Sequence, residues 1–383
     1  MKLTTAHQIA DIDPQCWNRL RGADNPFLQH AFLHALERHG AVAPDTGWLP
    51  HHLLLWEDDQ LVAAAPAYLK QHSWGEFVFD FAWAQAYERH GLNYYPKLVI
   101  GVPFSPVNGP RMLLDPNKPA EPLRDALATG AMRLTEQLGL SSAHWLFHAK
   151  EDQPALMRND YLHRTGCQFH WHNPGYADFE EFLAGMSAKK RKNIRRERRL
   201  VNSAEVEMQV IHGNEADPAL WTAMHRFYAN TFAAHGNLPL ISRDCFIEMG
   251  QALGDQLILF VGMRQSDPIA GAICFRDQTT LYGRYWGADE QLDGLHFEAC
   301  YYQGIDYCIK HGLRRFEPGA QGEHKIARGF LPTITHSAHY LVDTQFHKAV
   351  EHFLERERPA VAGYANALRE EAPFRAEVLA ELP

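Results

Sequence analysis

Cysteine is scarce in this sequence. The chain of 383 residues has six cysteines, and no two of them form a Cys-x-x-Cys pair. This usage argues against a disulfide scaffold and is typical of reduced thiols in a cytoplasmic protein. The 23 histidines are plentiful, but none falls in a His-Glu-x-x-His motif or a Cys/His ligand spacing. We therefore predict no metal site.

Long hydrophobic runs are also missing. The longest apolar stretch, at 61–69, contains Pro66 and falls well short of the roughly 20 residues that a membrane-spanning helix requires. The first 17 residues contain one lysine and no apolar centre, so they do not resemble a signal peptide. We expect a protein of the cytoplasm without an integral membrane segment.

The chain is long enough for two domains, and its two halves have a similar order of elements. A strand hairpin around Asp58–Asp59 and a helix over 122–139 are predicted in the first half. The second half reads as two helices, three strands, a helix and a strand, which favours mixed α/β layers. We place the domains at 1–165 and 166–383. The second includes a basic helix at 178–201 and a helical tail at 346–371, interrupted at Pro359.

Positive charge is concentrated in one segment of an acidic chain. The formal net charge is −9, yet eight basic residues and one acid lie between Lys189 and Arg199. An acidic chain argues against general nucleic-acid binding, but a local basic site can bind a specific anion. A solvated helix face and a contact with phosphate in RNA, a coenzyme or anionic lipid both fit this pattern. The candidate contacts are Lys189, Lys192, Arg195 and Arg199.

A strand, a loop and a helix follow one another in "LYGRYWGADEQLDGLHFEACYYQ", residues 281–303. The helix is predicted to begin near Asp293–Gly294. The free N–H groups at the start of a helix bind anions, including the phosphates of a coenzyme. The alternative is an ordinary turn in which Asp293 caps the helix.

Ionisable residues gather in a glycine-rich stretch after a predicted strand, "FEPGAQGEHKIARGFLP", residues 316–332. Acids and bases in such a loop can shift one another's pKa values into a range useful for proton transfer. The catalytic candidates are Glu317, His324, Lys325 and Arg328. A solvated loop with paired charges is the alternative.

Aromatic residues are irregularly spaced over 73–97, where Asp80 and Lys97 are among the charged residues. This spacing fits neither one strand face nor one helix face. The segment either lines a substrate pocket or fills a core.

Several of these segments, in the same order, resemble the bacterial FemAB-like family of predicted N-acyltransferases, also described as peptidoglycan biosynthesis/recognition proteins. The resemblance rests on "WGEFVFDFAWAQAYERHGLNYYPKL", "PFSPVNGPRMLL", "SAKKRKNIRRERR", "LYGRYWG", "LHFEACYYQGIDYCI" and "EPGAQGEHKIARGFLP". That family is similar to the Fem aminoacyl-tRNA-dependent transferases and belongs with the GNAT acyltransferases. The implied fold is two tandem GNAT-like domains, each a mixed sheet flanked by helices.

The resemblance also implies where a donor binds. It places an acyl or aminoacyl donor at the strand–helix junction, with Arg284, Gly287, Gly294 and Leu295 near its phosphates. The GNAT coenzyme motif Gln/Arg-x-x-Gly-x-Gly/Ala is matched at its first two positions, but Asp289 stands where its last small residue is expected. Fem enzymes carry a lysine in a Phe-Lys-x-x-Phe-Gly segment. This chain is similar to that segment in Lys325 and in the pair Gly329–Phe330.

Together these observations predict an N-acyltransferase without a tightly bound cofactor, using acyl-CoA or aminoacyl-tRNA as co-substrate. The acceptor would be an amine-bearing small molecule or cell-wall precursor. Two alternatives stay open: a non-catalytic module that binds such a precursor or RNA, and a peripheral contact of the basic helix with the inner membrane surface. We expect Glu317 or His324 to act as base and Lys325 and Arg328 to face the oxyanion or the donor phosphate. Tyr285 and Trp286 would shape the acyl pocket, and Glu298 would bind the acceptor ammonium.

Overall fold

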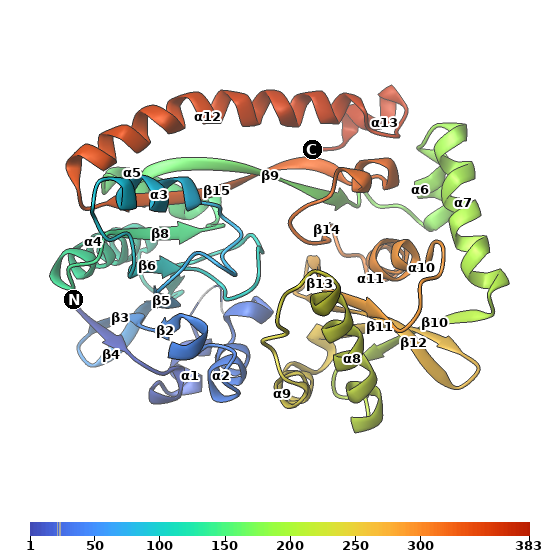
Figure 1. Cartoon of the computed structure of the whole chain (residues 1–383), viewed down its shortest axis with the longest axis horizontal. Coiled ribbons are helices and arrows are strands. Elements are labelled where there is room, and N and C mark those ends of the chain that lie inside the picture. Colours follow the sequence, from blue (N-terminus) through green and yellow to red (C-terminus); the bar gives the residue numbers. More distant parts are fainter. Residues whose placement is uncertain (21, 23) are drawn as a thin grey trace. The chain divides into compact units, whose positions relative to one another are not determined.

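The computed structural model describes residues 1–20, 22 and 24–383. These residues form two compact units (Figure 1). Unit 1 comprises Met1–Cys167 and Ile334–Gly363, and unit 2 comprises Gln168–Thr333 and Tyr364–Pro383. The chain first passes from unit 1 to unit 2 after Cys167, two residues from the domain boundary expected at 165. The return of 334–363 to unit 1 has no counterpart in the sequence analysis.

Unit 1 contains two groups of paired strands. One has the order β1-β3-β4-β7, and the other has the order β15-β8-β6-β5-β2. Its strands are β1 (Lys2–Ala6), β2 (Trp48–Pro50), β3 (His52–Glu57), β4 (Gln60–Ala65), β5 (Ala67–Lys70), β6 (Lys97–Ile100), β7 (Leu113–Leu114) and β8 (Ser142–Leu146). Its helices are α1 (Pro14–Asn18), α2 (His30–Arg38), α3 (Phe81–Arg89), α4 (Ala120–Gln137) and α5 (Gln153–Arg158).

Two predicted elements of unit 1 are confirmed. Asp58 and Asp59 both have positive φ angles, 47° and 61°, and connect the antiparallel strands β3 and β4. Aspartate tolerates this conformation better than most residues, and the resulting turn matches the twist of the strands. The helical spacing at 122–139 corresponds to α4, whose buried residues Leu123, Leu127 and Ala131 join the core.

Unit 2 contains the strand order β10-β11-β12-β13-β14-β9. Its strands are β10 (Val206–His212), β11 (Leu257–Arg264), β12 (Asp267–Arg276), β13 (Thr280–Ala288) and β14 (Arg315–Glu317). Its helices are α6 (Phe179–Ala184), α7 (Ala188–Ser203), α8 (Pro218–Ala234), α9 (Arg243–Leu253), α10 (Leu295–Phe297), α11 (Gln303–His311) and α13 (Ala376–Glu381). A π-helical turn at Glu298–Tyr302 joins α10 to α11.

Three elements contain a boundary between the units: β9 (Leu162–His172), β15 (Leu331–Leu341) and α12 (Thr344–Glu370). The expected mixed α/β class is confirmed, because each unit combines a mixed sheet with flanking helices.

The structure corrects two helix predictions. The basic segment expected as one helix over 178–201 forms α6 and α7, separated by Gly185–Ser187. In the break, Met186 pairs with Phe374 as an isolated β-bridge, and Ser187 N–H donates to Pro373 O at 2.9 Å. The tail is one continuous helix, α12, with Pro359 inside it, rather than two helices divided by that proline.

A close packing of α8 on β13 depends on Gly287. A Cβ atom at this position would lie 1.8 Å from Phe227 O in α8. Because no side chain fits in that space, glycine allows the helix backbone to rest directly on the strand. This packing explains Gly287 without a ligand.

Candidate functional site

A small cavity opens where the parallel strands β13 and β14 separate. Their pairing runs from Thr280 opposite Arg315 to Tyr282 opposite Glu317. Beyond this point, later residues of β13 and residues that follow β14 line a cavity of about 250 Å³. Its walls come from β12, β13, the π-helical turn and the glycine-rich loop, and include Arg284, Tyr285, Trp286, Tyr301, His324 and Lys325.

Arg284 is directed by a β-bulge. In the β12–β13 ladder Ile273 pairs with Tyr285 and Cys274 pairs with Gly283, so Arg284 is the extra residue of the bulge. A bulge bends the strand locally and re-aims its side chains. Burial lowers the pKa of this guanidinium, which still remains protonated in a protein.

Lys325 lies on a 3₁₀ turn, Glu323–Arg328, and only 3% of its surface is exposed. Its Nζ donates a hydrogen bond to Gly319 O at 2.9 Å. Burial lowers the pKa of Lys325 to about 8, Cys300 opposes this effect, and the charge of Arg284 adds to it. The ammonium form therefore predominates at pH 7, close to the point at which it loses its proton.

His324 lies next to Lys325 in the chain and lines the same cavity. Its Nε2 is 2.8 Å from the Tyr301 hydroxyl. Burial lowers the pKa of His324, and the charges of Lys325 and Arg328 lower it further. The imidazole is therefore mainly neutral at pH 7 and is able to accept a proton.

Arg328 holds the turn in place. One guanidinium nitrogen donates to His324 O at 2.8 Å, and the other donates to the Glu197 carboxylate at 2.9 Å. The guanidinium carbon lies 3.3 Å from the centre of the Phe297 ring. Arg328 is not among the residues that line the cavity. Its contacts connect the turn that carries His324 to α7.

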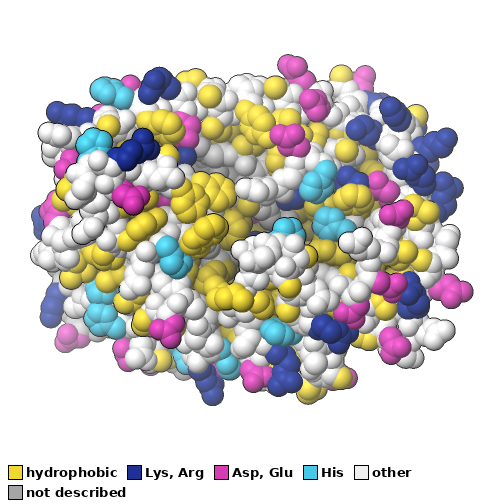
Figure 2. Space-filling view, in the orientation of Figure 1, with side chains coloured by type: hydrophobic (Ala, Val, Ile, Leu, Met, Phe, Trp, Pro, Cys, Tyr) yellow, Lys and Arg dark blue, Asp and Glu magenta, His cyan; other side chains and the backbone are white. Residues whose placement is uncertain are grey.

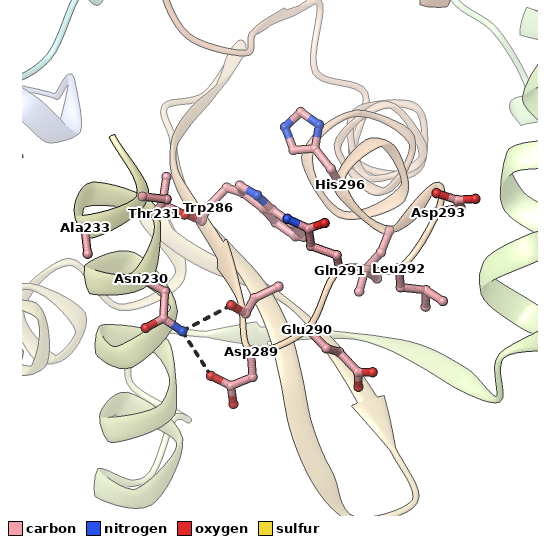
Figure 3. A pocket seen from close by; sticks show the side chains of 13 residues that line it. Asn230, Thr231, Ala233, Trp286, Asp289, Glu290, Gln291, Leu292, Asp293 and His296 are labelled. Carbon is pink, nitrogen blue, oxygen red and sulfur yellow. Dashed lines mark hydrogen bonds between the residues drawn. The ribbon is translucent and has the colours of Figure 1, made fainter. Parts of the chain in front are cut away.

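A larger cavity of about 590 Å³ adjoins the first, because Trp286 and His296 line both. Figure 3 shows it between α8 and the loop that precedes α10. Three carboxylates line it, those of Asp289, Glu290 and Asp293.

Two of these carboxylates have cationic partners. Asp289 forms an ion pair with Arg226 at 2.7 Å and accepts a hydrogen bond from Asn230 at 3.2 Å, and Glu290 pairs with Arg264. Asp293 is exposed and does not cap the helix, because the N-cap residue is Gly294.

The residues predicted to contact donor phosphates lie in several places. Arg284 lines the smaller cavity, and Leu295, which is buried, lines the larger one. Gly287 packs under α8, as described above. A Cβ on Gly294 would lie 2.9 Å from Glu197 O, so this glycine allows α7 to approach the start of α10.

Two carboxylates that the sequence suggested for the site, Glu317 as a base and Glu298 as the contact for the acceptor ammonium, lie outside both cavity linings. Glu298 is buried and forms an ion pair with Arg198 at 3.1 Å and a hydrogen bond with Gln303 at 2.7 Å. Glu317 is buried, 3.1 Å from an Arg315 nitrogen and 4.0 Å from His170 Nε2. Both carboxylates are therefore held by neighbouring side chains.

Asp80 and Lys97 lie in the interior of unit 1. Lys97 Nζ donates to Ser73 Oγ at 2.9 Å, to Glu76 at 2.8 Å and to Asp80. The side chains of Lys97, Glu76 and Asp80 are at most 3% exposed. We call these three residues the buried charge triad. Around it, part of the aromatic segment fills a core, including Trp83, Tyr87 and Tyr94.

The basic residues of α7 divide into inward and outward groups. Arg198 pairs with Glu298 and Asp306, and Arg195, which is exposed, pairs with Glu180. A third group is spaced by three, four and three residues and so shares one face of the helix. No ion pair involves its members among the residues that the structure describes. This basic stripe consists of Lys189, Lys192, Arg196 and Arg199, all exposed.

Figure 2 shows Lys and Arg side chains gathered at the right of the view, over the position of α7 in Figure 1. Over ten residues of helix the stripe extends about 15 Å. Of the four residues predicted for phosphate contact, Lys189, Lys192 and Arg199 belong to it. Arg196 was missed, because sequence spacing alone does not reveal that Glu180 neutralises Arg195.

Sequence reasoning also missed Tyr301, His296 and Cys300. They belong to the helical segment after β13, where their apolar and aromatic neighbours indicate only core packing. A hydroxyl or a thiol among such residues does not by itself indicate that the side chain lines a cavity. Their role in the cavity wall depends on the bulge and the separation of β13 from β14.

The described residues contain neither a candidate metal site nor a candidate membrane-spanning helix. No group of three or more His, Cys, Asp or Glu side chains is arranged to hold a metal ion. Among the helices in the described part of the chain, none has both the length and the apolar character needed to cross a membrane.

Known structures share the fold. FemX superposes with a TM-score of 0.54 at 11% identity, covering 92% of this chain and 100% of that one. The C-terminal domain (DUF2156) of a putative lysylphosphatidylglycerol synthetase from Agrobacterium fabrum gives 0.54 at 8% identity, covering 88% and 93%. A conserved protein of unknown function from Bacteroides thetaiotaomicron VPI-5482 gives 0.50 at 11% identity, covering 88% and 99%.

Sequence comparison gives the family. No curated protein matches the chain. The model of the FemAB-like family, described as peptidoglycan biosynthesis/recognition, matches residues 8–376, nearly the whole chain. The resemblance noted from the sequence is therefore confirmed, and the chain belongs to the FemAB-like family.

Proposed function

We propose that this protein is an N-acyltransferase that moves an acyl or aminoacyl group from an activated donor to an amine, with the smaller cavity of unit 2 as its active site. One observation carries the proposal: a neutral imidazole and a buried ammonium, those of His324 and Lys325, line the same small cavity. Acyl transfer to an amine requires a proton acceptor and a stabiliser of the oxyanion.

The chemistry follows from these two groups. The amine nitrogen attacks the donor carbonyl carbon while His324 accepts the amine proton. The Lys325 ammonium donates a hydrogen bond to the carbonyl oxygen as negative charge develops there. When the tetrahedral intermediate collapses, the bond to the donor oxygen or sulfur breaks and the leaving group takes the proton from His324. No resident cofactor is needed, because the activated donor supplies the reactive carbonyl.

The walls of the cavity support positioning of the acyl group. Tyr285 and Trp286 line it from β13, and the Tyr301 hydroxyl in the π-helical turn is hydrogen-bonded to His324. Aromatic walls exclude water and strengthen the electrostatic contacts of the reaction. Arg328 acts as a positioning residue, since its guanidinium holds the His324 carbonyl.

Two features favour aminoacyl-tRNA over acyl-CoA as the donor. The loop before α10 presents three carboxylates to the larger cavity. Arginines pair with those of Asp289 and Glu290, so the exposed Asp293 is the one that would repel a coenzyme pyrophosphate. The basic stripe of α7 offers unpaired cations spaced along about 15 Å, which suits a polyanionic donor. The family description supports an amine-bearing peptidoglycan precursor as acceptor.

A panel of donors and acceptors tests the proposal. Purified protein would be incubated with acetyl-CoA, long-chain acyl-CoA or a mixture of aminoacyl-tRNAs, each with a mixture of amines that includes peptidoglycan precursors. Products would be identified by mass spectrometry. We expect an amide product with at least one donor class, and most product with aminoacyl-tRNA. Binding of an acceptor without product from any donor would instead support a non-catalytic binding module.

The basic stripe yields a separate prediction. Changing Lys189, Lys192, Arg196 and Arg199 to Glu is expected to weaken binding of bulk tRNA at least tenfold at moderate salt. The slope of log K against log salt should become shallower by about three to four, because each of the four phosphate contacts releases close to one counterion. Fluorescence anisotropy of labelled tRNA at several salt concentrations measures both quantities.

A matched variant controls for net charge. Lys310, Arg314, Lys348 and Arg356 are exposed cations outside α7, and their change to Glu alters the charge by the same amount. This control should retain more of the affinity than the stripe variant. Equal losses of tRNA affinity in the two variants would indicate that the stripe is a solvated helix face and does not contact the tRNA.

A further inference from the structure

A buried tyrosine hydroxyl is hydrogen-bonded to His324 in the smaller cavity. Tyr301 Oη lies 2.8 Å from His324 Nε2, and both residues line the cavity. Tyr301 belongs to the π-helical turn at Glu298–Tyr302, and only 3% of its surface is exposed. Single π-helical turns inside helices occur frequently at functional sites. The proposed chemistry assigns a role to His324 but none to this hydroxyl.

Aromatic neighbours hold the Tyr301 ring on several sides. It stacks on Phe297 with 6.1 Å between the ring centroids. It meets Phe330 edge to face at 5.3 Å and His296 at 5.4 Å. Aromatic pairs at such distances favour defined ring orientations. The hydroxyl is therefore a fixed point in the cavity wall.

The imidazole of His324 is held from its own side of the cavity. The backbone carbonyl of His324 accepts a hydrogen bond from Arg328, and the ring lies against Gly322. A Cβ atom at Gly322 would lie 2.5 Å from His324 Cε1 and 3.0 Å from Nδ1, so the ring occupies the space of the missing side chain. The φ angle of Gly322 is 116°, which favours glycine. These contacts position the ring with Nε2 toward Tyr301.

The direction of the hydrogen bond follows from the proton of the hydroxyl. Burial raises the pKa of Tyr301, so the hydroxyl keeps its proton. Among the residues that the structure describes, His324 is the hydrogen-bond partner of this hydroxyl, and a buried donor without an acceptor is unfavourable. Tyr301 therefore donates to Nε2, and a neutral His324 has its own proton on Nδ1. Because His324 is exposed, solvent is able to accept from Nδ1–H.

We infer that Tyr301 is a further catalytic residue, whose hydroxyl relays the proton of the amine to His324. This inference rests on the proposed function. As the amine nitrogen attacks the donor carbonyl, its proton passes to Tyr301 Oη while the Oη proton passes to His324 Nε2. The hydroxyl is neutral before and after this step, and the imidazole becomes an imidazolium.

The second half of the reaction uses the same atoms in reverse. When the tetrahedral intermediate collapses, the bond to the donor oxygen or sulfur breaks. The leaving atom takes the proton of Tyr301 Oη, and Oη regains a proton from His324 Nε2. The relay returns to its starting state with each product formed, and two protons move in each half-reaction.

Histidine NMR in the absence of any donor tests the hydrogen bond. The ring-nitrogen signals of isotope-labelled protein distinguish the two neutral tautomers, and His324→Gln identifies the His324 signals among those of the 23 histidines. We expect the Nδ1–H tautomer in the wild type. Tyr301→Phe should shift His324 toward the Nε2–H tautomer and raise its pKa, because the neutral imidazole loses a hydrogen-bond donor. The Nε2–H tautomer in the wild type, or an unchanged tautomer in Tyr301→Phe, would overturn the inference.

Kinetics test the relay with the donor that gives most product. Tyr301→Phe keeps the ring but removes the hydroxyl, and should lower kcat by about 10²-fold with little change in KM. Rates in mixtures of light and heavy water should indicate two protons in motion in the wild type and one in the variant. A change that acted only through packing would leave this number unaltered. Undiminished kcat in folded Tyr301→Phe would contradict the relay.

Tyr307→Phe is the matched control. It removes another buried tyrosine hydroxyl of unit 2, which has no hydrogen-bond partner among the described residues and is outside the cavity lining. We expect the wild-type kcat and the wild-type number of moving protons in this variant. Thermal unfolding checks that each variant is folded. If Tyr301→Phe does not fold, the tautomer of His324 in the wild type still decides the direction of the hydrogen bond.

Failure of the relay and failure of the proposed function are distinguishable. If no donor gives product, the proposed function falls and the relay falls with it, whichever tautomer His324 adopts. If product forms but His324 has its proton on Nε2, or Tyr301→Phe turns over at the wild-type rate, the transferase proposal stands and the relay alone falls.

Discussion

Replacing Lys97 with methionine is expected to lower the free energy of unfolding by about 3–5 kcal/mol. The substitution keeps much of the side-chain volume but removes the positive charge that faces Glu76 and Asp80, both buried. Burial raises the pKa of Asp80, but the charges of Lys97 and His144 and the hydrogen bonds from Lys97 and Ser73 together hold it below its ordinary value. Without Lys97, the Asp80 carboxylate stays buried beside a neutral group. Urea unfolding followed by circular dichroism measures the loss.

Two controls separate charge pairing from packing. Combining Lys97→Met with Glu76→Gln and Asp80→Asn removes the whole buried charge triad, and should be less destabilising than Lys97→Met alone. Lys118→Met breaks a partly exposed pair with Glu57 and should cost far less stability than Lys97→Met, because solvent screens an exposed pair. A Lys97→Met protein as stable as the wild type would contradict the importance of the triad.

Replacing Lys325 with methionine is expected to lower kcat by about 10²–10³-fold, with a smaller effect on KM. The reason is that Lys325 donates to an oxyanion that exists only after attack. In the wild type, activity should fall as the pH rises above about 8, because the ammonium then loses its proton. On the acid side, activity should fall where His324 becomes protonated, below the ordinary pKa of histidine, since burial lowers it. Steady-state rates across this pH range measure both limbs.

The pH profile distinguishes a chemical role of Lys325 from a structural one. A residual rate in Lys325→Met should lack the alkaline limb, and Lys325→Arg should recover part of the rate because it restores a cation. Lys310→Met, which removes an exposed lysine of the same unit, should leave both rate and profile unchanged. Undiminished turnover in Lys325→Met would remove Lys325 from the mechanism.

Local patterns predicted local structure well. The apolar runs around Asp58–Asp59 indicated a hairpin, and the spacing of Leu123 and Leu127 indicated α4, because each pattern reports burial of one face. The division of the basic helix at Gly185–Ser187 was not predictable. It depends on Phe374, nearly 190 residues further along the chain, which pairs with Met186.

The candidate site could be predicted only in part. His324 and Lys325 are adjacent in a loop rich in glycine and charge, and the structure brings both to one cavity. Glu298 and Glu317 have the right chemistry in the same segments, yet neither lines that cavity. Whether a carboxylate is paired with an arginine, as these are with Arg198 and Arg315, is a property of tertiary packing. Residue type and spacing do not encode it.

The discontinuous units affect how the chain can fold during synthesis. Strand β8 pairs with β15 from Leu146 opposite Ser337 to Ser142 opposite Leu341, so this part of unit 1 requires residues made after most of unit 2. A ribosome that has translated the first 330 codons has produced an N-terminal sheet with one strand missing. Multidomain proteins commonly fold from the N-terminus, one domain after another. Unit 1 cannot do so, because it cannot complete its fold before most of unit 2 has been synthesised. Its edge strand β8 must remain protected until β15 (Leu331–Leu341) emerges, which gives a reason to expect dependence on chaperones.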